Sequence, residues 1–371
     1  MAARGFFVKF YCLIRGYSVK LSNSDGVQPL HIAQSGKESL VVQPSISFVC
    51  CIESGRLEDQ TLLMLKTLRK FGGRLANCTV FAVKARTGPP LSPATLLVMS
   101  ELDVKYIEDS TYNVAPWFNY SNKPAAVYWA QCNAVTDLVA WLDSDVLIAS
   151  EPLGLLLGSG VDFAARAEYL PPAIHDGNSK NIPYWQSLCN LLCADFDDLP
   201  WISLEIPVVK MRAFFNSGVF VWRRSSCFAE SYLSAFEKLL KSKLASCSGT
   251  AWYADQVVIS PVLVRERIKW RHLELVEHHM AFPGHLVGPS ATPSMSKSSV
   301  IHYSGSLAGE SEPVMLQRLF CEVPHLHKEI LEHRKSCEVT ELSFLWGPLR
   351  VFRKLRLWYF LRSLNVAKVG L

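Results

Sequence analysis

Long apolar runs and paired cysteines are both missing from this sequence of 371 residues. We find no run that reaches the roughly 18 apolar residues needed for a membrane-spanning helix. The eleven cysteines are odd in number and scattered, with no Cys-x-x-Cys pair and no zinc-ligand spacing. We interpret them as mostly buried free thiols in a reducing compartment, which predicts a cytoplasmic protein.

Clustered basic residues are missing from most of the chain. The formal net charge is +5, but residues 342–371 contain six basic residues and no acidic one. The rest of the sequence is therefore close to neutral. A nucleic-acid-binding surface needs grouped basic residues that neutralise phosphates, so we expect no nucleic-acid partner for the main body.

Strand and helix patterns alternate after a weakly patterned leader at residues 1–45. Apolar, partly β-branched runs predict strands, and apolar residues at helical spacing predict the helices between them. Such alternation is typical of a parallel α/β sheet built by crossover connections. The predicted strands are 47–52, 77–83, 104–108 and 138–145, and the predicted helices are 57–73, 91–102 and 122–134.

Two carboxylates lie two residues apart at the end of the fourth predicted strand, in the stretch AWLDSDVLI. The carboxyl ends of strands in open α/β sheets are where ligands bind. If the strand continues through Asp143 and Asp145, their side chains point the same way and can converge on one divalent cation. The alternative is a strand-ending turn with two solvated carboxylates.

Four blocks, taken together and in order, resemble the nucleotide-sugar transferases of the GT-A fold, most closely glycosyltransferase family 8. They are WLDSDVLIASEP (141–152), FFNSGVFVWRR (214–224), WYADQVVIS (252–260) and VIHYSG (300–305). The resemblance covers about residues 47–305. It implies an α/β fold with a mainly parallel central sheet flanked by helices. It also implies a metal-dependent transferase that moves a sugar from a UDP-sugar, with retaining stereochemistry by analogy.

The resemblance implies roles for five residues. Asp143, Asp145 and His302 would hold Mn²⁺, or Mg²⁺, beside the donor diphosphate. Asp255 would bind hydroxyls of the donor sugar, and Gln256 would lie under its anomeric carbon. For Asp255 the alternative is a residue that offsets a helix dipole, and for His302 it is a core histidine.

Four further residues are candidate substrate-binding groups. The Asn216 amide can hydrogen-bond a sugar hydroxyl, and Gly218 would allow close backbone approach, although both could simply form a turn. Lys123 is either a contact to the nucleotide or a surface lysine, and Arg166 is a weaker candidate for the diphosphate or the sugar. We interpret the pair His278–His279 as a surface feature.

One position departs from the family pattern, which continues His-x-x-Gly-x-x-Lys-Pro-Trp. This chain has Ala308 where the phosphate-binding lysine is expected. Another basic residue would have to replace it, for instance Lys297 or Arg318, or the protein would be weakly active. The first strand also lacks the usual uracil-contacting pattern, so the nucleobase is inferred from the resemblance.

The predicted organisation has three parts. After the leader, a GT-A domain spans residues 46–310, with a nucleotide-binding half at 46–145 and a sugar and acceptor half at 146–310. Within it, residues 169–201 are expected to form an acceptor-side loop. Residues 311–371 form a C-terminal helical region. Its tail places five apolar residues on one helical face, which predicts either peripheral contact with an anionic membrane or docking on the main domain. These residues are Val351, Phe352, Leu355, Trp358 and Tyr359.

The sequence therefore predicts a glycosyltransferase that acts on a glycan, lipid-linked or protein acceptor. Two alternatives remain at this stage. One is a non-catalytic GT-A domain that binds a nucleotide-sugar or a partner. The other is a haloacid dehalogenase-like phosphatase, in which Asp143 would be a covalent nucleophile and Asp197–Asp198 the later acidic pair. That class needs the motif on its first strand, whereas three predicted strands precede it here.

Overall fold

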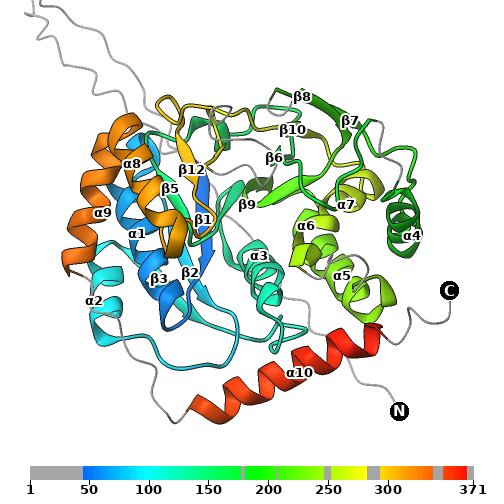
Figure 1. Cartoon of the computed structure of the whole chain (residues 1–371), viewed down its shortest axis with the longest axis horizontal. Coiled ribbons are helices and arrows are strands. Elements are labelled where there is room, and N and C mark those ends of the chain that lie inside the picture. The colour runs from blue at the N-terminus through cyan, green and yellow to red at the C-terminus, as the bar shows by residue number, and fades with distance from the viewer. Residues whose placement is uncertain are drawn as a thin grey trace, which may run out of the picture. The chain divides into compact units, whose positions relative to one another are not determined.

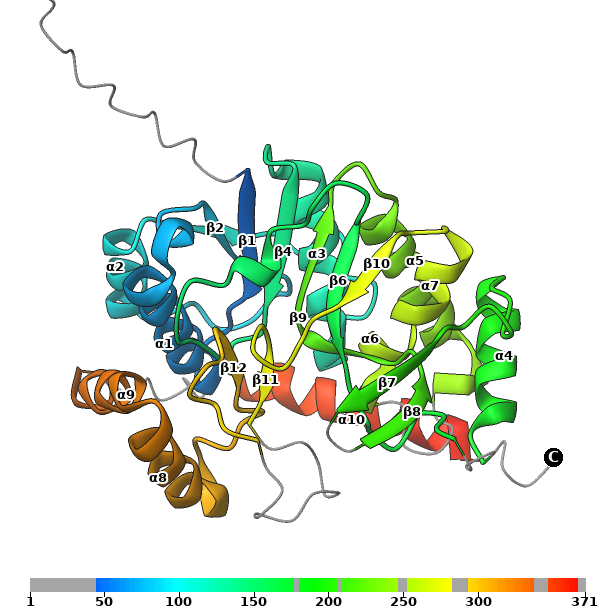
Figure 2. The same cartoon turned by 90° about the horizontal axis from the view of Figure 1, so that it is seen from above.

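The structure is a computed structural model that describes residues 45–176, 180–205, 208–245, 252–281, 293–336 and 346–365. Residues 1–44 of the predicted leader lie outside the described residues. Figures 1 and 2 show a central sheet with helices on both faces. No helix in the described part of the chain is long and apolar enough to cross a membrane.

The central sheet has seven strands in the order β10-β6-β9-β4-β1-β2-β3. Strand β9 is antiparallel to both of its neighbours, and the other strand pairs are parallel. The predicted α/β class with a mainly parallel central sheet flanked by helices is therefore confirmed. The strands are β1 (Ile46–Cys51), β2 (Val80–Lys84), β3 (Val104–Glu108), β4 (Leu138–Leu142), β6 (Phe163–Ala167), β9 (Phe215–Arg223) and β10 (Trp270–His272).

Helices cover both faces of this sheet because successive side chains of its strands point to opposite sides. On β1, Phe48 packs with the helices α1 and α2, whereas its neighbour Val49 packs on the face of α3, α5 and α7. Ser92 caps α2 by accepting a hydrogen bond from the backbone N–H of Thr95, as its position before Pro93 predicts. These helices are α1 (Arg56–Phe71), α2 (Pro93–Glu101), α3 (Asn122–Asn133), α5 (Phe228–Lys241) and α7 (Ile259–Arg265).

A small second sheet joins segments that are far apart in the sequence. Strand β12 (Val300–His302) lies between β11 (His279–Met280) and β5 (Val146–Ile148), parallel to the former and antiparallel to the latter. Two helices, α8 (Glu312–Glu322) and α9 (Pro324–Ser336), pack against it around Leu147 and Ile301. This sheet brings residue 302 beside residue 146.

The remaining elements lie outside these two sheets. The predicted loop at 169–201 contains the helix α4 (Ile182–Leu192), so the expectation of a loop there is wrong in part. A hairpin follows, formed by β7 (Trp201–Glu205) and β8 (Val208–Arg212). The short helix α6 (Ala254–Val257) precedes α7, and α10 (Gly347–Asn365) is the last helix described. Short 3₁₀ helices lie at Gly73–Leu75, Asn119–Ser121, Leu153–Leu155 and Gly309–Ser311.

The thiols differ from the expectation in their exposure. Every cysteine in the described part of the chain is free, as predicted. Among these described cysteines, Cys50, Cys78 and Cys189 are buried, whereas four others are exposed. The prediction of mostly buried thiols is therefore wrong for the exposed group, which consists of Cys132, Cys193, Cys227 and Cys321.

Candidate active site

The two aspartates of the Asp-x-Asp motif lie in a turn between two strands. Strand β4 ends at Leu142 and β5 begins at Val146, so the expected continuous strand through residue 145 is wrong. The backbone N–H of Asp143 donates a hydrogen bond of 2.8 Å to the carbonyl of Gly218 on β9. Both aspartates nevertheless line the same cavity.

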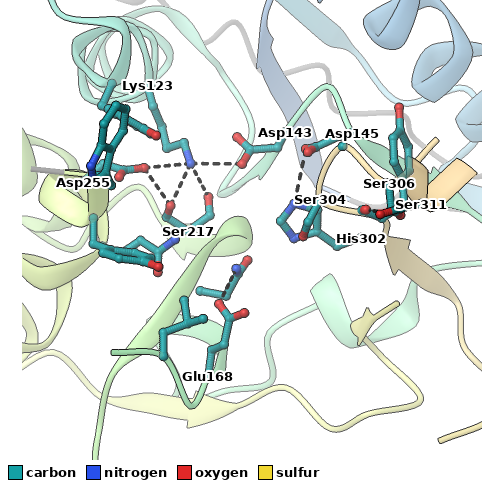
Figure 3. Close-up of a pocket in the computed structure, with 18 residues that line it drawn as sticks. Lys123, Asp143, Asp145, Glu168, Ser217, Asp255, His302, Ser304, Ser306 and Ser311 are labelled. Atoms are coloured by element: carbon teal, nitrogen blue, oxygen red, sulfur yellow. Dashed lines mark hydrogen bonds and ion pairs between the residues drawn. The ribbon is translucent and has the colours of Figure 1, made fainter. Parts of the chain in front are cut away.

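His302 reaches these aspartates from the second sheet. Its backbone is paired with Val146, and its Nε2 lies 3.2 Å from Oδ1 of Asp145. One ligand atom from each of Asp143, Asp145 and His302 lies within 4.8 Å of the others, and Figure 3 shows the three side chains together. Two carboxylates and an imidazole are a suitable donor set for a divalent cation. The structure therefore brings together the three predicted metal ligands.

Gly218 provides the space for the His302 ring. A Cβ atom at this position would lie 2.2 Å from Cε1 and 2.5 Å from Nδ1 of His302. No real side chain tolerates such distances, so any larger residue would displace the imidazole. The close approach that glycine was expected to permit is thus an approach of His302.

Burial and neighbouring charges act in opposite directions on these groups. Burial raises the pKa of Asp143 above its ordinary value, although the Lys123 ammonium opposes this. For Asp145, burial is outweighed by His302, which lowers the pKa of that carboxyl. For His302, burial is likewise outweighed, and Asp145 raises the pKa of the imidazole. An ion pair between ionised Asp145 and protonated His302 is therefore favoured as long as no metal cation takes the place of the imidazole proton.

Lys123, in the first turn of α3, is a buried link between two carboxylates. Its Nζ lies 3.1 Å from Oδ2 of Asp143 and 2.9 Å from Oδ2 of Asp255. It also donates hydrogen bonds to the hydroxyl and the carbonyl of Ser217. Burial opposes its charge, but the two aspartates raise the pKa of this amine above its ordinary value. Lys123 is thus part of the site and not a surface lysine.

Asp255 and Gln256 present buried oxygen atoms without partners. Asp255, only 2% exposed, uses Oδ2 for Lys123 and for the Ser217 hydroxyl, which donates at 2.7 Å. Its Oδ1 and the Oε1 of Gln256 are buried with no hydrogen-bond partner among the described residues. Because α6 has only four residues, offsetting a helix dipole does not account for Asp255. Unsatisfied acceptors at a cavity wall suit a ligand rich in hydroxyl groups.

Asn216 is held by two hydrogen bonds within the protein. Its Oδ1 accepts from the backbone N–H of Gly218, and its Nδ2 donates to Oε2 of Glu168, both at 2.7 Å. Arg166 is buried and donates to the carbonyl of Leu273, and it does not line either cavity described below. The structure therefore brings Asn216 to the site and leaves Arg166 behind its wall.

Two adjoining cavities meet at the Asp-x-Asp turn. The larger, of about 730 Å³, contains Glu168, Asn216, Asp255 and Gln256, and we call it the large cavity. The adjoining cavity, of about 460 Å³, lies beside the ends of β1 and β2. Both are lined by Tyr120, Lys123, Asp143, Asp145, Trp252, Ser304 and Gly305. One extended ligand could therefore pass from one cavity to the other across the predicted metal ligands.

The basic residues suggested as replacements at position 308 do not line these cavities. Neither Lys297 nor Arg318 does so. Arg56, at the start of α1, lines the adjoining cavity and donates a 3.2 Å hydrogen bond to the carbonyl of Gly305. Arg86 also lines it but is paired with Glu53. Sequence reasoning did not find Arg56, because it lies far along the chain from His302.

The histidine pair at 278–279 is buried and not on the surface, which corrects the prediction. Both residues are 0% exposed; His279 lies on β11, which pairs with β12, and His278 directly precedes that strand. The ring of His278 is stacked 5.8 Å from the ring of His302. Sequence reasoning also made no prediction for Glu168 and Ser217. Glu168 directly follows β6, and Ser217 lies on β9 between the predicted residues Asn216 and Gly218.

Comparison with known proteins identifies the family. Residues 48–267 match the model of a family described as the Rhodobacterales glycosyltransferase domain. The chain belongs to this glycosyltransferase family. It is therefore a glycosyltransferase. A comparison with curated proteins finds no match.

Solved structures with a similar arrangement are glycosyltransferases as well. The chain is 14% identical to the bifunctional glycosyltransferase WbbM, with a TM-score of 0.49, and the match covers 79% of this chain and 52% of WbbM. The galactosyltransferase LgtC, solved with donor and acceptor sugar analogues, is 12% identical with a TM-score of 0.44, and the match covers 81% of this chain and 99% of LgtC. GlyE of Streptococcus pneumoniae is 13% identical with a TM-score of 0.44, and the match covers 80% of this chain and 66% of GlyE. The chain thus spans about half the length of WbbM.

The phosphatase alternative is not favoured in this glycosyltransferase. The strands β1, β2 and β3 all precede the Asp-x-Asp turn, whereas that alternative requires the motif on the first strand. Asp197 and Asp198 line neither cavity, and the Asp197 side chain is 90% exposed.

Proposed function

We propose that this glycosyltransferase uses a divalent cation, Mn²⁺ in preference to Mg²⁺, to transfer a sugar from a UDP-sugar to an acceptor hydroxyl. The observation that carries the proposal is the group Asp143, Asp145 and His302 at the junction of two cavities. A nucleoside would occupy the adjoining cavity and the sugar would occupy the large cavity. The similarity of four sequence blocks to glycosyltransferase family 8 supports UDP and retention of configuration.

The donor set supports the choice of cation. Asp143 and Asp145 offer hard oxygen ligands, and the imidazole of His302 adds a nitrogen that favours Mn²⁺ somewhat over Mg²⁺. A bound divalent ion would stabilise the negative charge that builds on the leaving diphosphate. We propose that these three side chains hold it.

Two cations of the chain complete the diphosphate end. Lys123 keeps Asp143 and Asp255 in place and adds a positive charge between the cavities. Arg56 lines the adjoining cavity and bonds only a backbone carbonyl in the described hydrogen-bond network, so its guanidinium can also donate to a phosphate oxygen. We propose that Arg56 supplies the basic contact that Ala308 cannot make.

The sugar end is formed by Asp255, Gln256 and Asn216. The free buried oxygens of Asp255 and Gln256 can accept hydrogen bonds from sugar hydroxyls. In our proposal Asp255 binds the donor sugar and Gln256 lies under its anomeric carbon. We propose that the transferase domain comprises residues 46–310, with a nucleotide-binding half at 46–145 and a sugar and acceptor half at 146–310, and that a C-terminal helical region follows at residues 311–371.

A donor screen by thermal denaturation tests the proposal. UDP with Mn²⁺ should stabilise the protein by roughly 2.7 kcal/mol at a hundred times its Kd, and EDTA should remove this effect. GDP and dTDP should stabilise less. Arg56→Ala should reduce stabilisation by UDP but not by uridine, which lacks phosphates. If no nucleoside diphosphate stabilises the wild-type protein with Mn²⁺, the proposed function is wrong.

The exposed face of α10 supports a further part of the proposal, contact with an anionic membrane. The helix docks on the body through the opposite face, where Leu357 and Phe360 pack against the core and the Phe360 ring lies 4.9 Å from that of Trp117. The apolar face predicted from the sequence stays exposed, with values from 53% to 60%, at Val351, Phe352, Leu355, Trp358 and Tyr359. The helix therefore docks on the main domain through one face, while its other face stays exposed. That exposed face carries basic and aromatic side chains, which suit contact with an anionic membrane.

Binding to lipid vesicles tests this surface. The double variant Phe352→Ser, Trp358→Ser should lose at least about tenfold in affinity for phosphatidylserine vesicles at low salt, because interfacial aromatic residues supply the apolar part of binding. Thermal stability should stay close to wild type, since both side chains are exposed. The matched variant Phe360→Ala should lower thermal stability because it removes a docked side chain. Unchanged vesicle binding by the double variant would contradict the membrane contact.

A further inference from the structure

The charges that line the large cavity are paired with one exception. Lys123 is paired with Asp143 and Asp255, and Asp145 with His302. Glu168 also lines this cavity and is only 8% exposed, yet it forms no ion pair within the described part of the chain. A buried carboxylate without a paired cation is unfavourable unless other groups compensate it. Its retention at the cavity wall therefore points to a ligand.

The position of Glu168 supports a role toward that ligand. It directly follows β6, at the carboxyl end of a strand, and Figure 3 shows its carboxylate directed toward the other residues of the cavity. Asn216 fixes Oε2 by a 2.7 Å hydrogen bond, and Oε1 has no hydrogen-bond partner among the described side chains and backbone groups. Burial raises the pKa of this carboxyl although Asn216, His302 and Arg166 oppose the rise, so its compensation within the protein is incomplete.

The pair of Glu168 and Asn216 matches the hydrogen-bonding needs of a sugar hydroxyl. A hydroxyl group donates one hydrogen bond and accepts others. Glu168 can only accept when ionised, and Asn216 keeps one N–H that its bond to Glu168 does not use. A hydroxyl placed between them would donate to the carboxylate and accept from the amide. A sugar with its own carboxylate would be repelled there.

We propose that Glu168 binds a hydroxyl of the donor sugar and selects uncharged sugars over sugar acids. This inference rests on the proposed function, because it assumes a sugar nucleotide in the two cavities. It concerns the sugar alone, so the nucleoside diphosphate should bind without help from Glu168. Glu168 is then a specificity-determining residue that sequence reasoning did not identify.

Calorimetry with Mn²⁺ tests this role with UDP, UDP-glucose, UDP-galactose and UDP-glucuronic acid. Glu168→Gln should bind UDP within about threefold of wild type. It should lose about tenfold to a hundredfold of the extra affinity that the preferred neutral sugar adds to UDP, since bonds to charged groups are the stronger ones. Its discrimination against UDP-glucuronic acid should shrink by a similar factor. Glu168→Asp, which keeps the charge, should retain that discrimination.

The variants separate a binding role from a structural one. Thermal denaturation checks the folding of Glu168→Gln, and its stability should hold because the new amide oxygen can still accept from Asn216. Asp197→Asn, at an exposed carboxylate outside both cavities, is the matched control. Unchanged sugar affinity and unchanged discrimination in Glu168→Gln would overturn this inference alone. If wild-type protein binds none of the four nucleotides with Mn²⁺, the proposed function falls, and this inference falls with it.

Discussion

Asp145→Asn and His302→Ala are expected to lose Mn²⁺-dependent nucleotide binding while the protein stays folded. The three ligand groups lie within 4.8 Å of each other; His302→Ala removes one of them, and Asp145→Asn replaces an anionic carboxylate by a neutral, weaker amide ligand. With the donor set incomplete, the affinity for UDP in Mn²⁺ should fall by on the order of a hundredfold or more. Calorimetry with Mn²⁺ and with EDTA measures this loss, and thermal denaturation confirms folding.

Gly218→Ala tests the position of His302 without removing a metal ligand. It keeps all three ligands but introduces a Cβ at 2.2 Å from Cε1 of His302, so the imidazole must move. We expect a loss of Mn²⁺ dependence here too, although every ligating side chain is still present. Unchanged UDP affinity in Mn²⁺ for both Asp145→Asn and His302→Ala would show that the metal assignment is wrong.

Gln256→Ala and Asp255→Asn should separate nucleotide binding from turnover. Both residues face the large cavity and neither lines the adjoining cavity, where the nucleoside would lie. Gln256→Ala should lower kcat by about a hundredfold, or about 3 kcal/mol in the transition state, with little change in UDP affinity. Asp255→Asn should weaken binding of the sugar nucleotide relative to UDP. Steady-state kinetics and calorimetry measure the two effects.

The structure predicts a second effect of Asp255→Asn, on thermal stability. Asp255 also pairs with Lys123 and accepts from Ser217, so Asp255→Asn should lower thermal stability, whereas Gln256→Ala should not. Gln317→Ala, an exposed change on α8, is the control for both. Turnover close to wild type in the two cavity variants would remove this pair from the active site.

Local signals in the sequence predicted much of the sheet and its helices. Strand β3 has the predicted bounds, and Ser92 followed by Pro93 marks the start of α2. Helix α4 was missed because Pro, Asn and Gly residues around it favour a loop. Its apolar residues nevertheless recur at helical spacing, so a helix signal was present. They are Trp185, Leu188, Cys189 and Leu192.

The candidate site was harder to predict where side-chain direction decides a role. Arg166 and Glu168 lie two residues apart, but the pairing of β6 with β9 shifts register between Ala165 and Ala167. A register shift of this kind changes which side chains point to a given face of the sheet, and the local sequence does not predict it. The expectation of a contact therefore went to Arg166, whereas the structure places Glu168 in the cavity.

Burial from distant partners was also outside the reach of the sequence. The residues His278–His279 carry no local sign of burial, yet both are buried, and the His278 ring stacks on that of His302, which is remote in the sequence. Lys123 was equally compatible with a surface position. Only its approach to Asp255, which is remote in the sequence, shows that it is a buried link.

The second sheet has a consequence for how this enzyme can be shortened. The family match ends at residue 267, whereas His302 lies on β12, beyond that limit. A fragment trimmed to the matched segment would keep both aspartates but lose the imidazole, and β5 would lose its antiparallel partner. Such a fragment could retain much of the large sheet and still be inert. Inactivity of a trimmed domain would then reflect the missing strand and not the chemistry of the intact chain.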